Sequence, residues 1–272
     1  MSKRNSQAAK TAARERLRIE REKQAKRDKT RRQMIVGASI VGVLAVAAGA
    51  GYLVMEANKP EYWEKAAKAK LVKPANSSGE NGTTVIIGKD SAKKTLKLYE
   101  DPRCPACAGF EQTLGSTIKQ DVADGKYKVQ FIGATFLDGR LMGEGSRNAL
   151  SALGAALNVS PEAFMAYKEQ LYSTKHHPEE SKDDFKKDSY LIKVADDVKE
   201  LKGNKEFQNA VEDGTYDRWA LEMSKTFDKN KDGVTGTPSL VMDGKKVTAE
   251  GSENSPGTVE EYNKALDKAL KG

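Results

Sequence analysis

The chain has 272 residues, with 46 Lys and Arg against 39 Asp and Glu and a formal net charge of +7. The positive excess lies in residues 1–32, which carry thirteen basic and four acidic residues (+9), so the rest of the chain is close to neutral at −2. A tail this basic could hold nucleic acid or anionic lipid, but a topology signal is favoured, and we predict no nucleic-acid partner. Only two cysteines and two histidines are present.

Residues 1–33 form a basic tail, which we interpret as a topology signal that stays in the cytoplasm. Residues 34–55 follow without a single charged side chain. At about 1.5 Å per residue, a helix of this length spans the roughly 30 Å hydrocarbon core of a bilayer. We therefore predict one transmembrane helix. A cleaved signal peptide is the alternative, which is disfavoured because the apolar stretch exceeds the usual ~7–15 residues.

Residues 56–82 are polar, contain two Lys-Pro pairs and close with Asn-Ser-Ser-Gly-Glu-Asn-Gly. This composition predicts a tether between the membrane and a domain over residues 83–271. We expect that domain outside the cytoplasm. Thiol pairs can persist in oxidised form there, and newly exported proteins need their disulfides made.

The domain begins with a strand–helix–strand pattern. Residues 85–87 and 95–99 have strand-like patterns, residues 104–122 have helical spacing, and residues 127–136 form the next predicted strand. Such a unit predicts a right-handed crossover between parallel strands. It places both cysteines at the carboxyl end of the strand over residues 95–99.

Helical spacing then dominates from about residue 144 to residue 228, which predicts an inserted helical domain. We expect helices over residues 145–157, 161–173, 182–201, 204–212 and 215–227. A hairpin with a two-residue turn at Asp243-Gly244 follows. Thr258 and Glu261 form a capping box that opens a last helix. The predicted fold class is α/β.

The cysteines stand as Cys104-Pro105-Ala106-Cys107, so that their sulfurs can meet across one helical turn. A disulfide at this spacing closes almost no loop and would stabilise the fold little through the unfolded chain. A redox-active pair is therefore favoured over a structural bridge or two small buried residues.

A metal site is the other alternative for the two cysteines. Zinc would require two further ligands, and the only histidines, His176 and His177, are adjacent in a predicted loop. Residues 228–233 copy the opening of an EF-hand loop, but Ser239 stands where the bidentate glutamate belongs. We predict no metal and no cofactor.

Two motifs carry a family resemblance. Residues 99–107 contain the cysteines in Tyr-Glu-Asp-Pro-Arg-Cys-Pro-Ala-Cys, and residues 233–240 have the sequence Gly-Val-Thr-Gly-Thr-Pro-Ser-Leu. With a helical insertion between them, they resemble the DsbA-like branch of the thioredoxin superfamily over roughly residues 82–271. The tail and anchor are similar to membrane-anchored members from Gram-positive actinobacteria. The resemblance implies a thioredoxin fold with an inserted helical domain, preceded by a single transmembrane helix and a basic N-terminal tail.

The resemblance also implies roles for the cysteine motif. Cys104, at the first turn of a helix, is expected to be the exposed, attacked sulfur, and Cys107 the shielded resolving partner. Pro105 and Ala106 shape the loop that faces the substrate. Relatives commonly carry a histidine where this chain has Ala106. That histidine is thought to favour an oxidising potential, so Ala106 is a departure from the pattern.

The second motif is similar to the family's cis-proline loop. A cis bond before Pro238 would leave the Thr237 backbone free to pair with an extended substrate strand. An ordinary turn proline before a strand is the alternative.

Many members of the superfamily place a buried carboxylate six residues before the first cysteine, and here that position is Leu98. Glu100 shares the strand face of Leu98, so we expect it to assist proton transfer. The alternative is that Glu100 and Asp101 are solvated carboxylates at a strand end.

These features predict a membrane-tethered thiol-disulfide oxidoreductase that forms disulfides in unfolded or reduced exported proteins. The resemblance implies a quinone-linked membrane thiol oxidase as its reoxidising partner. Two alternatives stay open. One is an extracytoplasmic thiol reductase or isomerase, for example in cytochrome maturation, and the other is a non-catalytic module that binds a metal such as copper through its thiolates.

Overall fold

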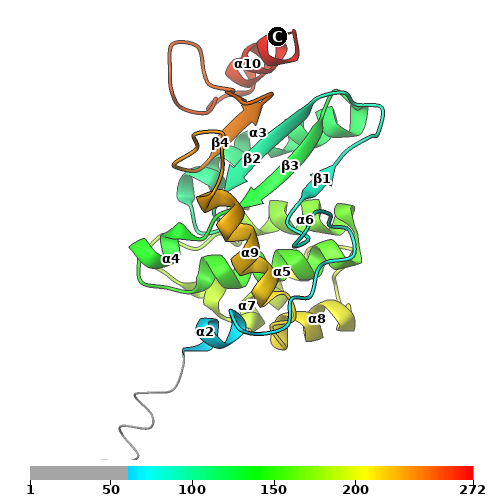
Figure 1. The fold of residues 1–272 in the computed structure, drawn as a ribbon, viewed down its shortest axis with the longest axis vertical. Helices are drawn as coiled ribbons and strands as arrows, with labels where there is room; N and C mark the ends of the chain where they lie inside the picture. The colour runs from blue at the N-terminus through cyan, green and yellow to red at the C-terminus, as the bar shows by residue number, and fades with distance from the viewer. Residues whose placement is uncertain (1–60, 272) are drawn as a thin grey trace, which may run out of the picture. The chain divides into compact units, whose positions relative to one another are not determined.

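The computed structural model describes residues 61–271 (Figure 1). The predicted basic tail and the predicted transmembrane helix over residues 34–55 lie outside this part of the chain. No helix within residues 61–271 combines the length and the apolar character needed to cross a membrane.

A five-stranded sheet in the order β1-β3-β2-β4-β5 forms the centre of the fold. The strands are β1 (Val85–Ile87), β2 (Thr95–Glu100), β3 (Lys128–Gly133), β4 (Ser239–Met242) and β5 (Lys245–Lys246). β2 and β3 are parallel, and α3 (Pro105–Asp124) connects them, which confirms the predicted strand–helix–strand unit. The other neighbouring pairs are antiparallel.

One face of the sheet packs against α3 and α10 (Val259–Lys271). Leu96 and Leu98 of β2 lie in this core beside Phe110 and Leu114 of α3. The capping box predicted for the last helix is present, because Thr258 and Glu261 exchange side chain to backbone hydrogen bonds of 3.2 Å each. Residues that alternate with the leucines, such as Tyr99, point to the opposite face.

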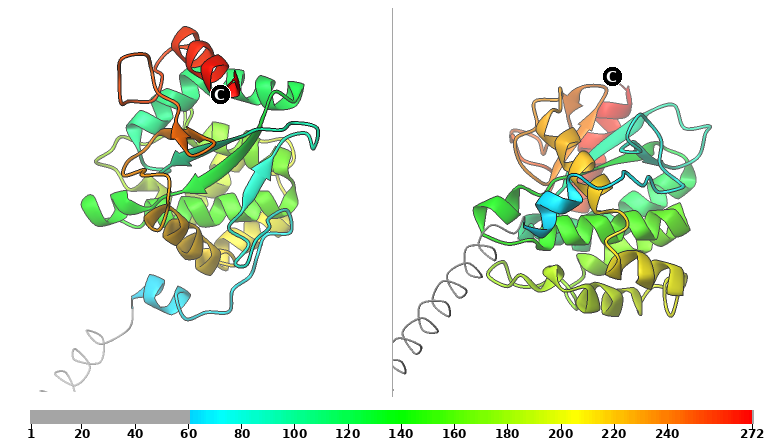
Figure 2. Two further views of the ribbon diagram at one scale, coloured as in Figure 1. Left: turned by 45° about the horizontal axis from the view of Figure 1, so that its top comes forward. Right: turned by 60° about the horizontal axis from the view of Figure 1, so that its bottom comes forward.

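The predicted helical insertion is confirmed between β3 and β4. It comprises α4 (Phe136–Arg140), α5 (Gly145–Val159), α6 (Pro161–Leu171), the 3₁₀ turn η1 (Asp184–Lys186), α7 (Asp188–Ala195), α8 (Lys205–Glu212) and α9 (Asp217–Asp228). Figures 1 and 2 show α10 and the sheet at one end of the domain and α5 to α8 at the other. α5 is nearly all buried and packs against α6, α8 and α9.

The single helix predicted over residues 182–201 is wrong, because the chain forms η1 and then the short α7. Asn148 of α5 explains the break. Its amide donates to the Phe185 carbonyl at 3.0 Å and to the Asp188 carboxylate at 2.9 Å. These bonds tie the junction between the two elements to α5, and Lys187 between them is extended.

The tether predicted over residues 56–82 is wrong for residues 61–82, which pack on the insertion. α2 (Tyr62–Ala66) buries Trp63, and the Arg147 guanidinium carbon lies 5.1 Å from the indole ring centre. Tyr62 donates a 2.6 Å hydrogen bond to Asp217.

The end of the same segment is also held. The indole N–H of Trp219 donates to the Gly82 carbonyl at 2.6 Å, and the Asn76 amide donates to the Leu157 carbonyl at 2.8 Å. The polar composition of residues 61–82 indicated a free linker. Composition does not reveal that groups of the helical insertion form hydrogen bonds with this segment.

If residues 61–66 belong to the domain, Trp63→Ala should lower its free energy of unfolding by about 3–5 kcal/mol, the usual cost of truncating a buried tryptophan. Chemical denaturation measures this change. Lys65→Ala, on the exposed side of the same helix, is the control and should change stability by less than about 0.5 kcal/mol. Equal stabilities of the two variants would show that this segment is a free tether after all.

Candidate active site

The two cysteines stand where β2 passes into α3. Cys104 is the N-cap residue of α3, with an extended backbone (φ −75°, ψ 115°), and Pro105 follows in the first turn. A helix N-terminus presents unpaired N–H groups and a positive dipole end, which favour a thiolate at this position. The prediction of an exposed Cys104 is wrong, because this residue is buried in a cluster with Tyr172 and retains only 8% exposure. Cys107 has no exposure, as predicted, and both are free thiols.

The two thiols differ sharply in acidity. A hydrogen bond from the Cys107 thiol is the main reason why the pKa of Cys104 falls to about 6; burial opposes the shift, and the backbone N–H groups of Cys107 and Ala106 add to it. Burial raises the pKa of Cys107 well above its ordinary value, and the bond to Cys104 and the charge of Glu100 raise it further. Cys104 is thus the thiolate of the pair and Cys107 the proton carrier.

The second motif meets the first across 133 residues of sequence. The peptide bond between Thr237 and Pro238 is cis, as the resemblance implied. The Cys104 thiol lies 3.6 Å from the Thr237 carbonyl oxygen, within range of a sulfur hydrogen bond. Pro105 and Ala106 are exposed beside this contact.

A groove of about 480 Å³ opens next to Cys104. Its lining includes Ala106 and Phe110 of the cysteine helix, Thr237 and Pro238 of the cis-proline loop, and residues 253–257. An extended peptide laid in this groove would pass beside Cys104.

The solvated carboxylates considered at the end of β2 are not found, because Glu100 and Asp101 are both fully buried. Lys168 of α6 lies between two carboxylates. Its Nζ is 3.0 Å from Glu100 Oε2 and 2.5 Å from Glu111 Oε2. The other Glu100 oxygen has no hydrogen-bond partner within residues 61–271.

Burial is the main reason why the pKa of Glu100 rises to about 7; Lys168 opposes the shift, and the charges of Glu111 and Cys104 add to it. Burial alone would lower the pKa of Lys168, but the two carboxylates outweigh it and raise that pKa. Sequence reasoning missed Lys168 because it lies on α6, 68 residues after Glu100 at the end of β2, with no local pattern to link them. Glu100 is therefore a group that gains and loses a proton near neutral pH within electrostatic reach of both cysteines.

A second buried network fixes the residues just before Cys104. Arg103 Nη1 donates to Asp138 at 3.0 Å, and Arg103 Nε lies 3.3 Å from Asp183. Asp101 accepts hydrogen bonds from the Ser146 hydroxyl at 2.6 Å and from the Arg103 N–H at 3.0 Å. The aspartates at 138 and 183 also accept the first N–H groups of α5, so the same carboxylates cap that helix and hold the cysteine loop.

The two histidines lie in the insertion. His176 Nε2 is 2.6 Å from Asp197, and His177 stacks on Tyr172, which packs beside both cysteines. Within residues 61–271, no cluster of three or more His, Cys, Asp or Glu side chains has the geometry to hold a metal ion.

The rate of Cys104 alkylation by iodoacetamide should follow the thiolate fraction and rise through a midpoint near pH 6. Cys107→Ala removes the hydrogen bond that contributes most to this acidity, so its midpoint should move up toward that of an ordinary cysteine. Cys107→Ser keeps a hydroxyl donor and is the matched control, with a smaller upward shift. Identical midpoints in wild type and Cys107→Ala would contradict this assignment.

The geometry agrees with comparisons to known proteins. A family model described as Thioredoxin matches residues 80–268. Disulfide bond formation protein D of Bacillus subtilis (strain 168) is 24% identical over 189 residues, which cover 69% of this chain and 77% of that protein. Serine/threonine-protein kinase PknE of Mycobacterium tuberculosis (strain ATCC 25618 / H37Rv) is 24% identical over 116 residues, 42% of this chain and 20% of the kinase.

Solved structures share the fold. Reduced DsbA from Mycobacterium tuberculosis has a TM-score of 0.52 at 21% identity, covering 67% of this chain and 99% of that one. MdbA from Actinomyces oris, a thiol-disulfide oxidoreductase, has a TM-score of 0.55 at 19% identity, covering 68% and 88%.

Proposed function

Because the chain belongs to the thioredoxin family and is a DsbA-like thiol-disulfide oxidoreductase, we propose that it forms disulfides in exported proteins through Cys104 and Cys107. The observation that carries this direction of electron flow is the similarity to a relative named for disulfide bond formation, and the lowered pKa of Cys104, about 6, agrees with it. A stabilised thiolate favours the reduced form of the pair. The oxidised pair therefore tends to give its disulfide away, because strong oxidants of this kind have a stabilised reduced form.

The exchange proceeds in two steps. A client thiolate attacks the sulfur of Cys104, which forms a mixed disulfide and breaks the bond to Cys107. A second client thiolate then attacks the client sulfur, which closes the client disulfide and releases Cys104 as a thiolate. Two electrons pass from the client to the cysteine pair. The acidity of Cys104 makes it the better leaving group in the second step.

Glu100 supplies the proton that this cycle needs at Cys107. The thiol of Cys107 must be protonated when the pair is reduced and deprotonated when the disulfide reforms, since its pKa lies well above neutral. A buried carboxyl with a pKa of about 7 can serve as donor and acceptor at that pH. Lys168 is the positioning residue, because its ammonium group holds one Glu100 oxygen and leaves the other unpartnered.

The groove beside Pro238 is the proposed client site. The cis bond and the Thr237 carbonyl next to Cys104 support it, as does the exposed Ala106, which lines the groove and follows the exposed Pro105. Pairing with the backbone of an extended client would not depend on the client's sequence, which suits a catalyst that acts on unfolded or reduced chains.

The remaining proposals concern location and partner. Residues 1–33 are the cytoplasmic tail, residues 34–55 the membrane anchor, and the catalytic domain stands on the extracytoplasmic side of the cell membrane. The uncharged stretch and the basic tail support this arrangement. The catalytic domain also includes residues 61–82, which were predicted to be part of the tether. A quinone-linked membrane thiol oxidase is the proposed reoxidising partner, on the strength of the family resemblance.

The alternative of a reductase or isomerase has one observation in its favour. Ala106 occupies the position where relatives that oxidise commonly carry histidine, and a tenfold change in the exchange equilibrium corresponds to only about 30 mV. The reduction potential of the Cys104–Cys107 couple separates the two directions.

The full chain, purified in an uncharged detergent, should oxidise a reduced unfolded protein such as ribonuclease A, whereas Cys104→Ala should have no activity. Its potential should lie above roughly −150 mV. Regain of ribonuclease activity and equilibration with glutathione measure the two quantities. A potential near the −270 mV of thioredoxin would assign the reductase role instead. Equal activity in Cys104→Ala would remove the proposed chemistry altogether.

Glu100→Gln should slow the step in which Cys107 attacks the mixed disulfide between Cys104 and glutathione by about 100-fold, the usual contribution of a general base. In wild type that step should accelerate as pH rises through about 7, where Glu100 becomes a carboxylate, and the variant should lose this inflection. Stopped-flow measurement of glutathione release reports it, while the first attack by Cys104 should change little.

Glu111→Gln is the matched control, since it alters the other partner of Lys168. It should retain the inflection at a lower pH, because the Glu111 charge helps to raise the pKa of Glu100. Removing the Glu100 charge alone would lower the pKa of Cys107 and speed the step, so slowing is diagnostic of proton transfer. A Glu100→Gln enzyme that keeps the inflection would refute this role.

A further inference from the structure

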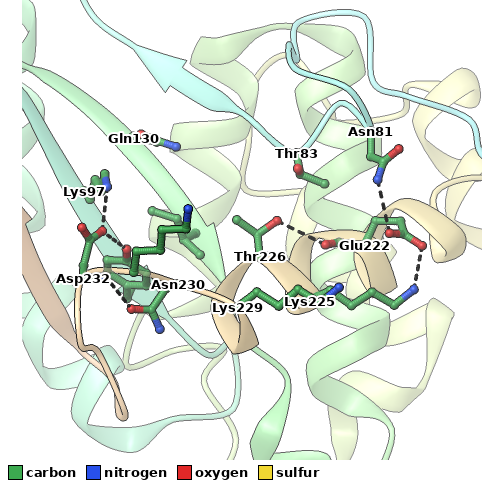
Figure 3. Close-up of a pocket in the computed structure, with 13 residues that line it drawn as sticks. Asn81, Thr83, Lys97, Gln130, Glu222, Lys225, Thr226, Lys229, Asn230 and Asp232 are labelled. Carbon is green, nitrogen blue, oxygen red and sulfur yellow. Dashed lines mark hydrogen bonds and ion pairs between the residues drawn. The ribbon is translucent and has the colours of Figure 1, made fainter.

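A second pocket, of about 420 Å³, lies on the sheet face opposite α3 and α10 (Figure 3). Its floor consists of Lys97 and Tyr99 of β2 and Gln130 of β3, which alternate with the core residues of those strands. Its walls are α9, residues 229–232 and residues 81–83. It shares no lining residue with the groove beside Cys104, so the proposed redox function does not account for it.

The pocket carries more positive than negative charge. Four lysines line it, at positions 97, 225, 229 and 231, against the two carboxylates of Glu222 and Asp232. Both carboxylates are already paired. Asp232 lies 2.6 Å from Lys97 Nζ, and Glu222 lies 2.8 Å from Lys225 Nζ.

Lys229 and Lys231 differ from the other two lysines. Neither has a carboxylate within ion-pair distance among residues 61–271, although both line the pocket. Two ammonium groups without counter-charges next to satisfied carboxylates leave this hollow positively charged. A net positive hollow attracts anions.

The loop that carries these lysines is pre-ordered by Asn230. The Asn230 side-chain oxygen accepts the N–H groups of Asp232 at 3.1 Å and Val234 at 3.0 Å, and its amide donates to the Phe227 carbonyl at 2.8 Å. This is the loop whose sequence copies an EF-hand opening. Its polar side chains hold the loop itself, and a ligand would not need to order the backbone.

Uncharged polar groups complete the lining. The side chains of Gln130 and Thr83 make no hydrogen bond within the part of the chain that the structure describes, and Figure 3 shows them around the same hollow as Lys229. An amide and a hydroxyl are therefore available beside the ammonium groups. Phosphate suits such a set, because it presents up to two negative charges and several acceptor oxygens, and lysine binds it as a point charge.

We propose that this pocket binds a phosphate-bearing ligand of the size of a polyol phosphate, either free or as the headgroup of an anionic lipid. The volume exceeds what a single phosphate needs and falls within the range of small-molecule sites. Lys229 and Lys231 neutralise the phosphate, and Gln130 and Thr83 bind its oxygens or the hydroxyl groups attached to it.

Isothermal titration calorimetry of the full chain in uncharged detergent micelles tests this site with inorganic phosphate and glycerol 3-phosphate as probes. Saturable binding is expected, tighter for glycerol 3-phosphate. The double variant Lys229→Gln/Lys231→Gln should bind at least about tenfold more weakly, since it loses two charge-assisted contacts. Lys199→Gln/Lys202→Gln, which changes two exposed lysines after α7, is the charge-matched control and should bind like wild type.

A second arm adds phosphatidylglycerol or phosphatidylcholine to the micelles and repeats the comparison. The basic tail is the same in all variants, so a difference between the two double variants reports the pocket alone. Loss of phosphatidylglycerol binding in the pocket variant identifies a lipid headgroup, and a loss confined to glycerol 3-phosphate identifies a free ligand; both support the site. The proposal is overturned if wild type shows no saturable binding of any phosphate probe, or if the two double variants bind alike. Ribonuclease oxidation at the wild-type rate confirms that both double variants are folded.

Discussion

The proposed redox site depends on the ion pairs that the ammonium group of Lys168 makes with Glu100 and Glu111. This ammonium group is buried, as are its two partners, and a charge in such a place is tolerated only when it is paired. Because Lys168 belongs to the insertion and Glu100 to the strand before the cysteines, the ion triad joins the two parts of the fold. If the insertion packed elsewhere, Glu100 and Glu111 would be buried without the ammonium group of Lys168. The helical insertion is therefore part of the proposed active site rather than an appendage beside it.

Burial and hydrogen bonding together set the acidity of the groups at this site. Glu100 has a pKa near neutrality because desolvation outweighs the attraction of Lys168, whereas Cys104 at the helix N-terminus has its pKa lowered chiefly by the thiol of Cys107. The Glu100 carboxyl and the thiols of Cys104 and Cys107 are thus all shielded and have three different pKa values. They lie within the end of β2 and the first turn of α3. Many members of the superfamily have a buried acid at the position of Leu98, whereas here the acid is Glu100, two residues later. Leu98 and Glu100 lie on the same face of β2, which runs from the core into the site.

Sequence alone predicted what local patterns determine. The parallel strands around the cysteine helix, the insertion, the turn at Asp243 and the capping box at Thr258 all follow from spacing within a few residues. What it missed depends on partners far along the chain. No local sequence pattern pairs Lys168 with Glu100. Trp63 lies in a polar segment, and its contact with Arg147 of α5 joins residues that are far apart in the sequence. Such contacts form only once the fold exists, so residues 61–82 appeared to be a tether.

Strand β2 serves two sites because its side chains alternate. Leu96, Leu98 and Glu100 point toward α3 and lead to the cysteines, while Lys97 and Tyr99 point toward α9 and form the floor of the lysine pocket. Asp232 holds both floor residues, through the Lys97 ammonium group and the Tyr99 hydroxyl. The chain then continues from Asp232 into the cis-proline turn. Strand β2 therefore leads to Cys104 with one face and forms the floor of the lysine pocket with the other. The sheet separates the proposed redox chemistry from the proposed anion binding without a second domain.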